Sequence, residues 1–276
     1  MCIRDRSKRI LVLGSGGREH AILFALMQSE PMPKLFAIPG NGGIAQIAEC
    51  HAIPISDFEA IANFVRENQI DFTVVGPEQP LVDGIVDHFR IAGLPILGPD
   101  KIAAQLEGSK AFSKSFMEKN GIATATFQTF TEPAPALAYL DGQKFPIVIK
   151  ASGLAAGKGV IIAQDKVEAT EAIHQIINKK VFGTAGNELI IEEFLQGIEM
   201  SVFVLTDGKT SLLLPTAQDH KRALENDEGL NTGGMGAYSP SVLETPELMQ
   251  QIQQEIAIPT LKGIAAEGGN YSGVLY

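Results

Sequence analysis

Short apolar runs closed by glycine or proline recur through the first hundred residues and alternate with helical stretches. The runs lie at residues 10–13, 35–38, 72–75 and 94–97. Apolar runs of this length, bounded by turn residues, are typical of strands buried on both faces of a parallel sheet. The stretches 21–27, 58–66 and 82–92 are predicted helices, with Asp57 as the N-cap of the second. Repeated strand–helix–strand units predict a parallel α/β domain over residues 8–107, with helices on both faces.

The pattern changes near residue 108, where strands begin to dominate. A helix is predicted over 110–119, and Asn120-Gly121 has the composition of a C-terminal cap. Asp207-Gly208 predicts a hairpin and therefore antiparallel pairing. Further strands are expected at 145–150, 159–163, 189–194, 199–205 and 211–215. We therefore predict an α+β domain over residues 108–276, distinct from the first domain.

The two ends of the chain carry different signals. Residues 1–7 have no pattern of their own, and we predict that they form a leader outside the fold. A helix is expected from Leu248 onward, with Pro259 as a kink or break. The final residues, 271–276, have the composition of a strand, and we expect the second domain to continue past Tyr276.

Composition restricts the partners of this chain. Its net charge is -10, and no long run of Lys or Arg suggests a nucleic acid partner. The two cysteines, Cys2 and Cys50, have neither metal-ligand nor disulfide spacing. No apolar run reaches the ~18 residues that a membrane span needs. We predict a cytoplasmic protein that acts on small molecules, without nucleic acid or membrane partners.

The first glycine loop, residues 14–20, follows a predicted strand and opens a helix. Glycines let the backbone approach an anion, and the first N–H groups of a helix are donors without intrahelical acceptors. Arg18 can add a bidentate phosphate contact. Glu19 stands at the third glycine position of the dinucleotide fingerprint, which favours a monophosphate ligand over NAD. The alternative is a tight turn without a ligand. Asn41 and Glu78 follow two other strands and are expected at the same sheet edge.

The second glycine loop runs from Lys150 to Val160 between two predicted strands. Gly153 to Gly157 is one residue too short for the Walker A spacing, and no helix follows. A glycine-rich loop between antiparallel strands is suited to close over a triphosphate, with Lys150 and Lys158 supplying charge. The alternative is an exposed hairpin loop.

A connector between two predicted strands follows at residues 194–198. Such a connector can present backbone groups to adenine, and Glu199 beyond it can bind ribose hydroxyls. The alternative is an ordinary strand–turn–strand with surface glutamates.

Taken together, seven segments resemble the phosphoribosylamine–glycine ligase family (glycinamide ribonucleotide synthetases) of the ATP-grasp superfamily, from about Lys8 to Tyr276. The segments are residues 14–20, 75–81, 106–110, 150–160, 192–195, 218–222 and 231–240. The resemblance implies a Rossmann-like pre-ATP-grasp domain followed by an incomplete ATP-grasp domain. The family pattern includes a Glu-x-Asn pair and an Arg-Phe-Gly-Asp-Pro-Glu run that this sequence lacks, so the expected ligands for Mg²⁺ or Mn²⁺ lie beyond Tyr276.

The resemblance also implies roles for individual residues. The ATP phosphates would be held by Lys110, Lys150, Ser152, Gly153, Gly157, Lys158 and Gly159. Adenine would contact Glu192 and Leu195, the ribose Glu199, and Glu193 is also expected at the nucleotide. Phosphoribosylamine would be held by Gly16, Gly17, Arg18, Asn41 and Glu78. The acceptor and glycine side would be lined by Asp219, Lys221, Arg222, Asn231, Thr232, Gly233, Gly234 and Met235. The residues expected to be catalytic are Lys150, Lys158 and Arg222.

The implied reaction joins glycine to 5-phosphoribosylamine with ATP, through a glycyl phosphate, and yields glycinamide ribonucleotide, ADP and phosphate. A monomer is expected. Two other interpretations remain: a non-catalytic or inactive ATP-binding fragment, and an NAD-dependent oxidoreductase suggested by the first strand–helix–strand unit.

Overall fold

Two units make up the chain in the computed structural model, which describes residues 6–155, 159–225 and 228–276. The first unit comprises the chain up to Ala104 together with Gly268–Gly273. The second comprises Gln105–Glu267 together with Val274–Tyr276. Within the described ranges, no helix combines the length and apolar character needed to cross a membrane.

The first unit is built on a five-stranded sheet in the order β3-β2-β1-β4-β5. All of its ladders are parallel, which confirms the predicted α/β architecture. The strands are β1 (Arg9–Gly14), β2 (Lys34–Pro39), β3 (Glu49–Cys50), β4 (Phe72–Val75) and β5 (Ile96–Leu97). Each strand is short and apolar because both of its faces are covered by helices.

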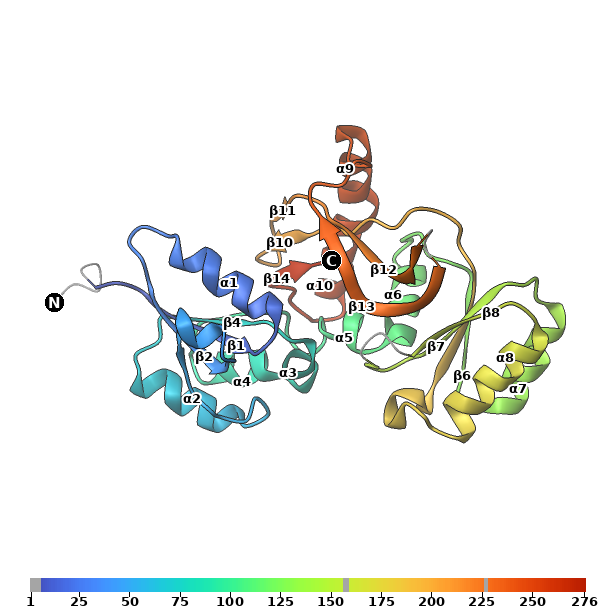
Figure 1. The fold of residues 1–276 in the computed structure, drawn as a ribbon, viewed down its shortest axis with the longest axis horizontal. Coiled ribbons are helices and arrows are strands. Elements are labelled where there is room, and N and C mark those ends of the chain that lie inside the picture. Colours follow the sequence, from blue (N-terminus) through green and yellow to red (C-terminus); the bar gives the residue numbers. More distant parts are fainter. Residues whose placement is uncertain (1–5, 156–158, 226–227) are drawn as a thin grey trace. The chain divides into compact units, whose positions relative to one another are not determined.

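Helices cover both faces of this sheet (Figure 1). Val12 packs in one core cluster with Leu23 of the helix on one face, whereas Leu11 and Leu13 pack with Ile61 and Phe89 on the other. The helices are α1 (Gly17–Met27), α2 (Phe58–Glu67), α3 (Glu78–Asp83), α4 (Ile85–Ile91) and the short 3-10 helix η2 (Ile44–Gln46). Alternation of side chains along β1 therefore divides the core between two helical layers.

Local signals explain where two of these helices begin and end. Asp57 caps α2 as predicted, since its Oδ1 accepts a hydrogen bond from Ala60 N at 3.0 Å. The single helix predicted over 82–92 is wrong, because Gly84 adopts φ +99° and separates α3 from α4. Glycine enters this left-handed region without a Cβ penalty, so it ends one helix and starts the next.

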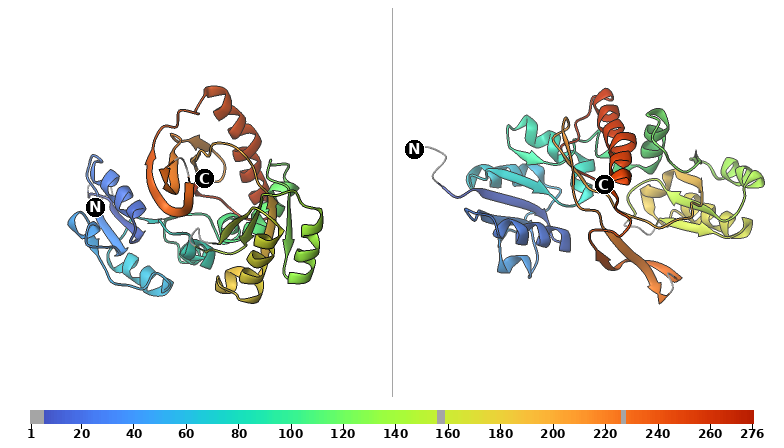
Figure 2. Two further views of the ribbon diagram at one scale, coloured as in Figure 1. Left: turned by 45° about the vertical axis from the view of Figure 1, so that its right-hand side comes forward. Right: turned by 90° about the horizontal axis from the view of Figure 1, so that it is seen from above.

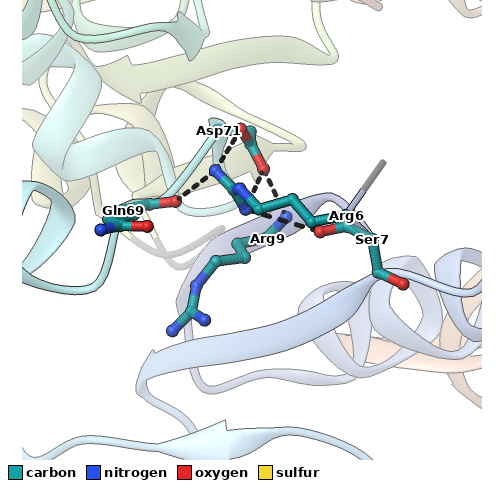
Figure 3. Close-up of polar contacts among 5 residues, drawn as sticks. All are labelled: Arg6, Ser7, Arg9, Gln69 and Asp71. Atoms are coloured by element: carbon teal, nitrogen blue, oxygen red, sulfur yellow. Dashed lines mark hydrogen bonds and ion pairs between the residues drawn. The ribbon is translucent and has the colours of Figure 1, made fainter. Parts of the chain in front are cut away.

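A carboxylate at the start of β4 holds the beginning of β1 (Figure 3). Asp71 Oδ1 and Oδ2 accept hydrogen bonds from the Arg6 guanidinium at 2.8 and 3.0 Å. Asp71 Oδ2 also accepts from Arg9 N at 2.7 Å, and Arg6 donates to Gln69 O at 3.2 Å. Arg6, which belongs to the stretch that we interpreted as a leader, is thus bonded to the first unit.

A four-stranded antiparallel sheet in the order β6-β9-β7-β8 forms the main layer of the second unit. Its strands are β6 (Phe127–Phe130), β7 (Ile147–Ala151), β8 (Val160–Ala163) and β9 (Leu189–Glu193). One face packs on α7 (Pro133–Tyr139) and α8 (Lys166–Ile173), through Ile149, Ile191 and their neighbours (Figure 1). Side chains at alternate positions, including Lys150 and Glu192, therefore lie on the opposite face.

Short helical turns join these elements in the second unit. They are η3 (Leu140–Gly142), the π-helix η4 (His174–Asn178) and η5 (Gly183–Asn187). The sequence analysis did not predict β6, α7 or α8.

Helices before and after this sheet complete the helical part of the unit. They are α5 (Gln105–Gly108), α6 (Lys110–Lys119), α9 (Pro246–Ile252), the π-helix η7 (Gln253–Ala257) and α10 (Ile258–Ala266). Helix α6 ends at Asn120, and Gly121 follows at φ +66°, as the cap signal predicts. We predicted a kink or break at Pro259, and the helical chain changes there from the π-helix η7 to α10 without a break; Pro259 lies in the first turn of α10, where a missing N–H costs little. The π-turn just before it lets the helical chain continue.

Two smaller sheets hold the remaining strands. The three-stranded sheet has the order β11-β10-β14, and the two-stranded ribbon pairs β12 with β13 (Figures 1 and 2). The strands are β10 (Val204–Thr206), β11 (Ser211–Leu213), β12 (Gln218–Leu224), β13 (Glu228–Tyr238) and β14 (Gly273–Leu275).

The hairpin predicted at Asp207-Gly208 joins β10 to β11 in antiparallel pairing. Asp207 Oδ1 accepts from Lys209 N at 2.9 Å and Thr210 N at 2.7 Å, and these bonds lower the pKa of Asp207 to about 2. The strand predicted over 199–205 is largely wrong, since only a bridge from Ser201 to Ala217 precedes β10.

Close packing between α6 and α10 generates a first prediction. A Cβ at Gly263 would lie 2.6 Å from both Phe116 Cζ and Asn120 Oδ1, and Phe116 is buried. We expect Gly263→Ala to lower the free energy of unfolding, because an overpacking cost of roughly 1–3 kcal/mol exceeds the helix propensity of about 1 kcal/mol that alanine gains. Urea unfolding followed by circular dichroism measures this. Gly142→Ala is the control, since no atom lies within 4 Å of its Cβ position. An unchanged midpoint in Gly263→Ala contradicts the account.

Candidate functional site

A pocket of about 530 Å³ lies at the carboxyl edge of the parallel sheet in the first unit. Its lining comes from the carboxyl ends of β1, β2 and β4 and the loops that follow them, with Ile55 from the segment after β3, as the topology predicts, because parallel strands end at the same edge. The lining residues are Gly14, Ser15, Gly16, Gly17, Arg18, Glu19, Pro39, Ile55, Pro77 and Glu78. The volume suits a small phosphorylated ligand.

The buried side chain of Glu19 packs against the first glycine loop. Its carboxylate accepts a hydrogen bond from Gly16 N at 2.6 Å, and its side chain is buried. A Cβ at Gly14 would lie 2.6 Å from Glu19, and a Cβ at Gly76 would lie 2.0 Å from Glu19 Oε1. Both glycines therefore make room for this carboxylate. Because the carboxylate already uses the Gly16 N–H, the loop offers less space and fewer donors to a pyrophosphate than a dinucleotide fingerprint does.

Arg18 and Glu78 lie together at the mouth of this pocket. Arg18 Nη1 donates to Gly76 O at 2.6 Å, and Nη2 donates to Glu78 Oε1 at 2.8 Å. The arginine side chain is half exposed, which leaves part of the guanidinium in contact with solvent. The helix N-terminus at Gly17 and this guanidinium supply positive potential on the same side of the pocket.

Asn41 holds two loops together through its amide. Its Nδ2 donates to Ser15 O at 2.7 Å, and its Oδ1 accepts from Gly43 N at 2.8 Å and Ile44 N at 2.9 Å. These contacts fix the first glycine loop against the loop after β2. In the structure, the position of Asn41 indicates a supporting role in shaping the pocket.

In the second unit, the start of the second glycine loop is joined to the N-terminus of α6. Lys110 N donates to Ser152 O at 2.8 Å, and Lys110 Nζ donates to Gly153 O at 3.1 Å. Ser152 Oγ accepts from Ala111 N at 3.1 Å. A Cβ at Gly153 would lie 2.7 Å from Ala185 Cα, so the loop begins in a position that only glycine fits.

The structure describes the second glycine loop up to Ala155 and again from Gly159. A Cβ at Gly159 would lie 2.9 Å from Ala155 Cβ. Gly157 and Lys158, which we predicted at the phosphates, lie outside the described residues.

Lys110 and Lys150 lie near this loop and repel each other electrostatically. Burial lowers the pKa of Lys110, Glu107 opposes the shift, and the positive charge of Lys150 lowers the pKa further. Lys150 forms an ion pair with Glu192 Oε1. Like charges that approach each other in a partly buried site favour the binding of an anion, since an anion relieves their repulsion.

Lys114 belongs to the same charged cluster, although the sequence analysis missed it. Its Nζ lies 2.6 Å from Glu192 Oε2 and donates to Thr124 Oγ1 at 2.8 Å. Lys114 is 8% exposed. The only sequence signal was its position one helical turn after Lys110, which places both lysines on one face of α6.

The connector after β9 exposes apolar side chains. Leu195 and Ile198 are both exposed, and Glu193 Oε1 accepts a hydrogen bond from Thr126 N at 2.9 Å. Glu199 is also exposed and accepts from Lys221 Nζ at 3.1 Å. Exposed apolar surface beside a charged cluster fits a ligand with a flat apolar part and an anionic part.

The β12–β13 ribbon carries the remaining predicted residues. No strand was predicted over 231–236, but these residues lie in β13, paired with β12. The pairing bulges on either side of Arg222, whose Nη1 donates to Gly229 O at 2.7 Å. The glycine-rich composition gave no strand signal because it lacks the apolar alternation of a half-buried strand, and the ribbon is exposed along most of its length.

Charged groups cluster on β12 of this ribbon. Lys221 lies 3.6 Å from Asp219 Oδ2, and Asp219 faces Ala237 in the pairing. Burial acts to lower the pKa of Lys221, but the hydrogen bond and charge of Glu199, with those of Asp219, raise it overall. On β13, Thr232 Oγ1 accepts from Gly234 N at 3.1 Å and Met235 is exposed.

Across residues 6–155, 159–225 and 228–276, no group of three or more His, Cys, Asp or Glu side chains is arranged to hold a metal ion.

Two family models match the chain. The model of the phosphoribosylglycinamide synthetase N domain matches residues 8–107, and that of the phosphoribosylglycinamide synthetase ATP-grasp (A) domain matches residues 108–276. Phosphoribosylamine–glycine ligase of Pasteurella multocida (strain Pm70) is 53% identical over 269 residues, which are 97% of this chain and 63% of the relative. The chain thus spans about 63% of the length of the curated relatives that it matches.

Solved structures share the fold. Phosphoribosylamine–glycine ligase from Thermotoga maritima superposes with a TM-score of 0.81 at 32% identity, over 96% of this chain and 63% of that chain. The biotin carboxylase domain of Hydrogenobacter thermophilus 2-oxoglutarate carboxylase, in complex with MgADP, has a TM-score of 0.72 at 18% identity, over 97% of this chain and 59% of that chain. The second likeness is one of fold alone.

The contact between Gly76 and Glu19 generates a second prediction. We expect Gly76→Ala to displace the Glu19 carboxylate from Gly16 N, because the new Cβ would lie 2.0 Å from Glu19 Oε1. The loss of a buried charged hydrogen bond should lower stability by roughly 1.5–3 kcal/mol, measured as a lower thermal midpoint. Gly17→Ala in the same loop is the control, since nothing lies within 4 Å of its Cβ position. Equal midpoints for the two variants contradict the role given to Glu19.

Proposed function

This chain belongs to the phosphoribosylglycinamide synthetase family, and we propose on that premise that it carries the ATP-binding and phosphoribosylamine-binding parts of a phosphoribosylamine–glycine ligase of purine biosynthesis. The proposal rests on the presence of one anion site in each unit. One lies at the edge of the parallel sheet in the first unit, and the other lies at the lysine cluster of the second unit. The two sites suit a phosphorylated sugar and a nucleotide, respectively. The proposal includes the predicted division into domains at residues 8–107 and 108–276.

ATP is proposed to bind the second unit. Lys110 and Lys150 are the groups for its phosphates, and their mutual repulsion in the free protein is relieved when phosphate charge is present. The exposed apolar connector at Leu195 suits the adenine, and Glu199 suits the ribose. Ser152, Gly153 and Gly159 shape the loop over the phosphates.

Phosphoribosylamine is proposed to bind the first unit. The helix N-terminus at Gly17 and the guanidinium of Arg18 suit its phosphate, and Gly16 allows the backbone to come close. Glu78 suits the ribose hydroxyls, and Asn41 supports the loop. The ribbon residues Asp219, Lys221, Arg222, Asn231, Thr232, Gly233, Gly234 and Met235 are proposed for the glycine and acceptor side.

The proposed chemistry proceeds in two steps. A glycine carboxylate oxygen attacks the γ-phosphorus of ATP, the bond to ADP breaks, and glycyl phosphate forms. The amine of phosphoribosylamine then attacks the acyl carbon, phosphate leaves, and the amine proton passes to solvent, which yields glycinamide ribonucleotide. Phosphoryl transfer needs positioning and charge neutralisation more than a side-chain nucleophile, which is why lysines suffice.

Mg²⁺ or Mn²⁺, when bound, would neutralise phosphate charge. The described residues do not form a site for such an ion, so no residue of this chain is assigned to it. The protein is proposed to act in the cytoplasm as a monomer, in line with its acidic composition and its few cysteines.

A ligation assay tests the proposed function. The 276-residue chain and a longer form matched to the full length of its relatives are given ATP, Mg²⁺, phosphoribosylamine and glycine labelled with ¹⁸O in its carboxylate. We expect glycine-dependent ADP release by the longer form, with one ¹⁸O in the phosphate, because the carboxylate oxygen leaves with the phosphoryl group. ADP release without ¹⁸O in phosphate contradicts the glycyl phosphate step. ATP binding without release in either form favours a non-catalytic nucleotide-binding protein.

The lowered pKa of Lys110 makes a further prediction. The protonated ammonium binds phosphate, so ADP affinity should fall as pH rises through the lowered pKa of Lys110, by at most about tenfold per pH unit. The fall should begin at a lower pH than for an ordinary lysine. Calorimetric titration with ADP between about pH 7 and pH 10 measures it, with adenosine as the uncharged control. Lys110→Arg should flatten the profile because arginine stays charged. The same fall in Lys110→Arg contradicts the assignment.

A further inference from the structure

Lys114 is a buried lysine to which the proposed chemistry gives no role. Its ammonium forms an ion pair with Glu192 and donates to Thr124 Oγ1 at 2.8 Å and to Ala125 O at 3.3 Å, and it lies 5.5 Å from the ring centroid of Phe127. Burial of a charge is costly unless the charge is paired and hydrogen-bonded. The Lys114 ammonium is paired with Glu192 and hydrogen-bonded to Thr124 and Ala125. Replacement of a whole buried ion pair by apolar side chains is often neutral for stability, so stability alone gives a poor reason for a buried Lys114–Glu192 pair at this position.

The carboxylate of Glu192 is shared between two lysines. Its Oε1 pairs with Lys150, and its Oε2 lies 2.6 Å from Lys114 Nζ. The three side chains together carry one net positive charge, and Lys110 adds a second. Without Lys114, the Glu192 carboxylate would have Lys150 as its sole cationic partner, and that pair would be neutral.

We propose that Lys114 is a positioning residue that forms an ion pair with one oxygen of the Glu192 carboxylate and so keeps the Lys150 ammonium available to the phosphates of a nucleotide. This inference rests on the proposed function, since it concerns the same nucleotide site. Lys114 does not touch the nucleotide. It acts through Glu192, and α6 therefore contributes one lysine to the phosphates and, one turn later, one to the carboxylate behind them.

The positions of Lys150, Glu192 and Lys114 support different roles for the two lysines. Lys150 and Glu192 lie on the face of the sheet opposite to the core formed with α8, and β7 and β9 are adjacent strands. The Lys150 side chain is 26% exposed, whereas Glu192 is 6% and Lys114 10% exposed. Solvent and ligands therefore reach the lysine that is proposed to bind phosphate, while its two partners stay covered.

Nucleotide binding to the 276-residue chain tests the inference. Dissociation constants for ATP and for adenosine are measured by calorimetry on the wild type, Lys114→Met, Lys114→Arg and the double variant Lys114→Met with Glu192→Gln. Lys119→Met is the control for loss of one charge from the same helix, since Lys119 pairs with Glu267 at the surface. Circular dichroism and gel filtration confirm that each variant is folded.

We expect Lys114→Met to weaken ATP binding by roughly 10–100-fold, with adenosine binding changed by less than about threefold. Lys114→Arg and Lys119→Met should bind ATP like the wild type. The double variant should recover most of the ATP affinity, because removal of both charges leaves Lys150 unpaired and restores the net charge of the cluster. A purely structural role predicts equal losses for ATP and adenosine and no recovery, and that result overturns the inference.

Two further outcomes separate the inference from its premise. Wild-type chain that binds no ATP overturns the proposed function and the inference together, whereas tight wild-type binding with no effect in Lys114→Met overturns the inference alone. If Lys114→Met does not fold, the double variant is compared with Glu192→Gln. The two should bind ATP within about threefold of each other, because Lys114 acts through the charge of Glu192, and a difference of about tenfold or more overturns the inference.

Discussion

A buried carboxylate organises the charged groups in each unit of this protein. In the second unit, Glu192 lies between Lys114 and Lys150 and fixes the position of both ammonium groups. Its own burial is possible only because two cations meet its two oxygens. The strands that carry Lys150 and Glu192 and the helix that carries Lys114 are thereby held in register at the site, in addition to the apolar core on the other face.

The first unit uses a buried glutamate for a different purpose. Glu19 satisfies the N–H of Gly16 and fills the space that Gly14 and Gly76 leave open, so it joins the ends of two neighbouring strands. The loop that results offers a helix N-terminus and an arginine to a single anion. In both units, the cations or N–H groups that we propose for ligands are therefore arranged by a carboxylate that stays inside the protein.

Much of this arrangement could be predicted from the sequence. The parallel sheet was predictable because strands buried on both faces are continuously apolar, and the loops after β1, β2 and β4 had to meet at one edge. The break between α3 and α4 at Gly84 could not be predicted, since the residues on both sides of it share a helical pattern. The β12–β13 ribbon lacked alternation because most of it is exposed. Lys114 escaped notice because its position one helical turn after Lys110 gives no sign of burial, and its partner, Glu192, lies far along the chain.

The central claim is that the nucleotide binds the second unit, beside the cluster of Glu192 and its lysines. Photolabelling of the 276-residue chain with 8-azido-ATP, followed by peptide mapping, tests it most directly, with excess ATP as the competitor. The account predicts label in peptides that contain residues 189–199, at the end of β9 and the exposed connector, and loss of that label with ATP. Competed label in residues 14–20 of the first glycine loop would contradict the account, because it would place the nucleotide at the edge of the parallel sheet.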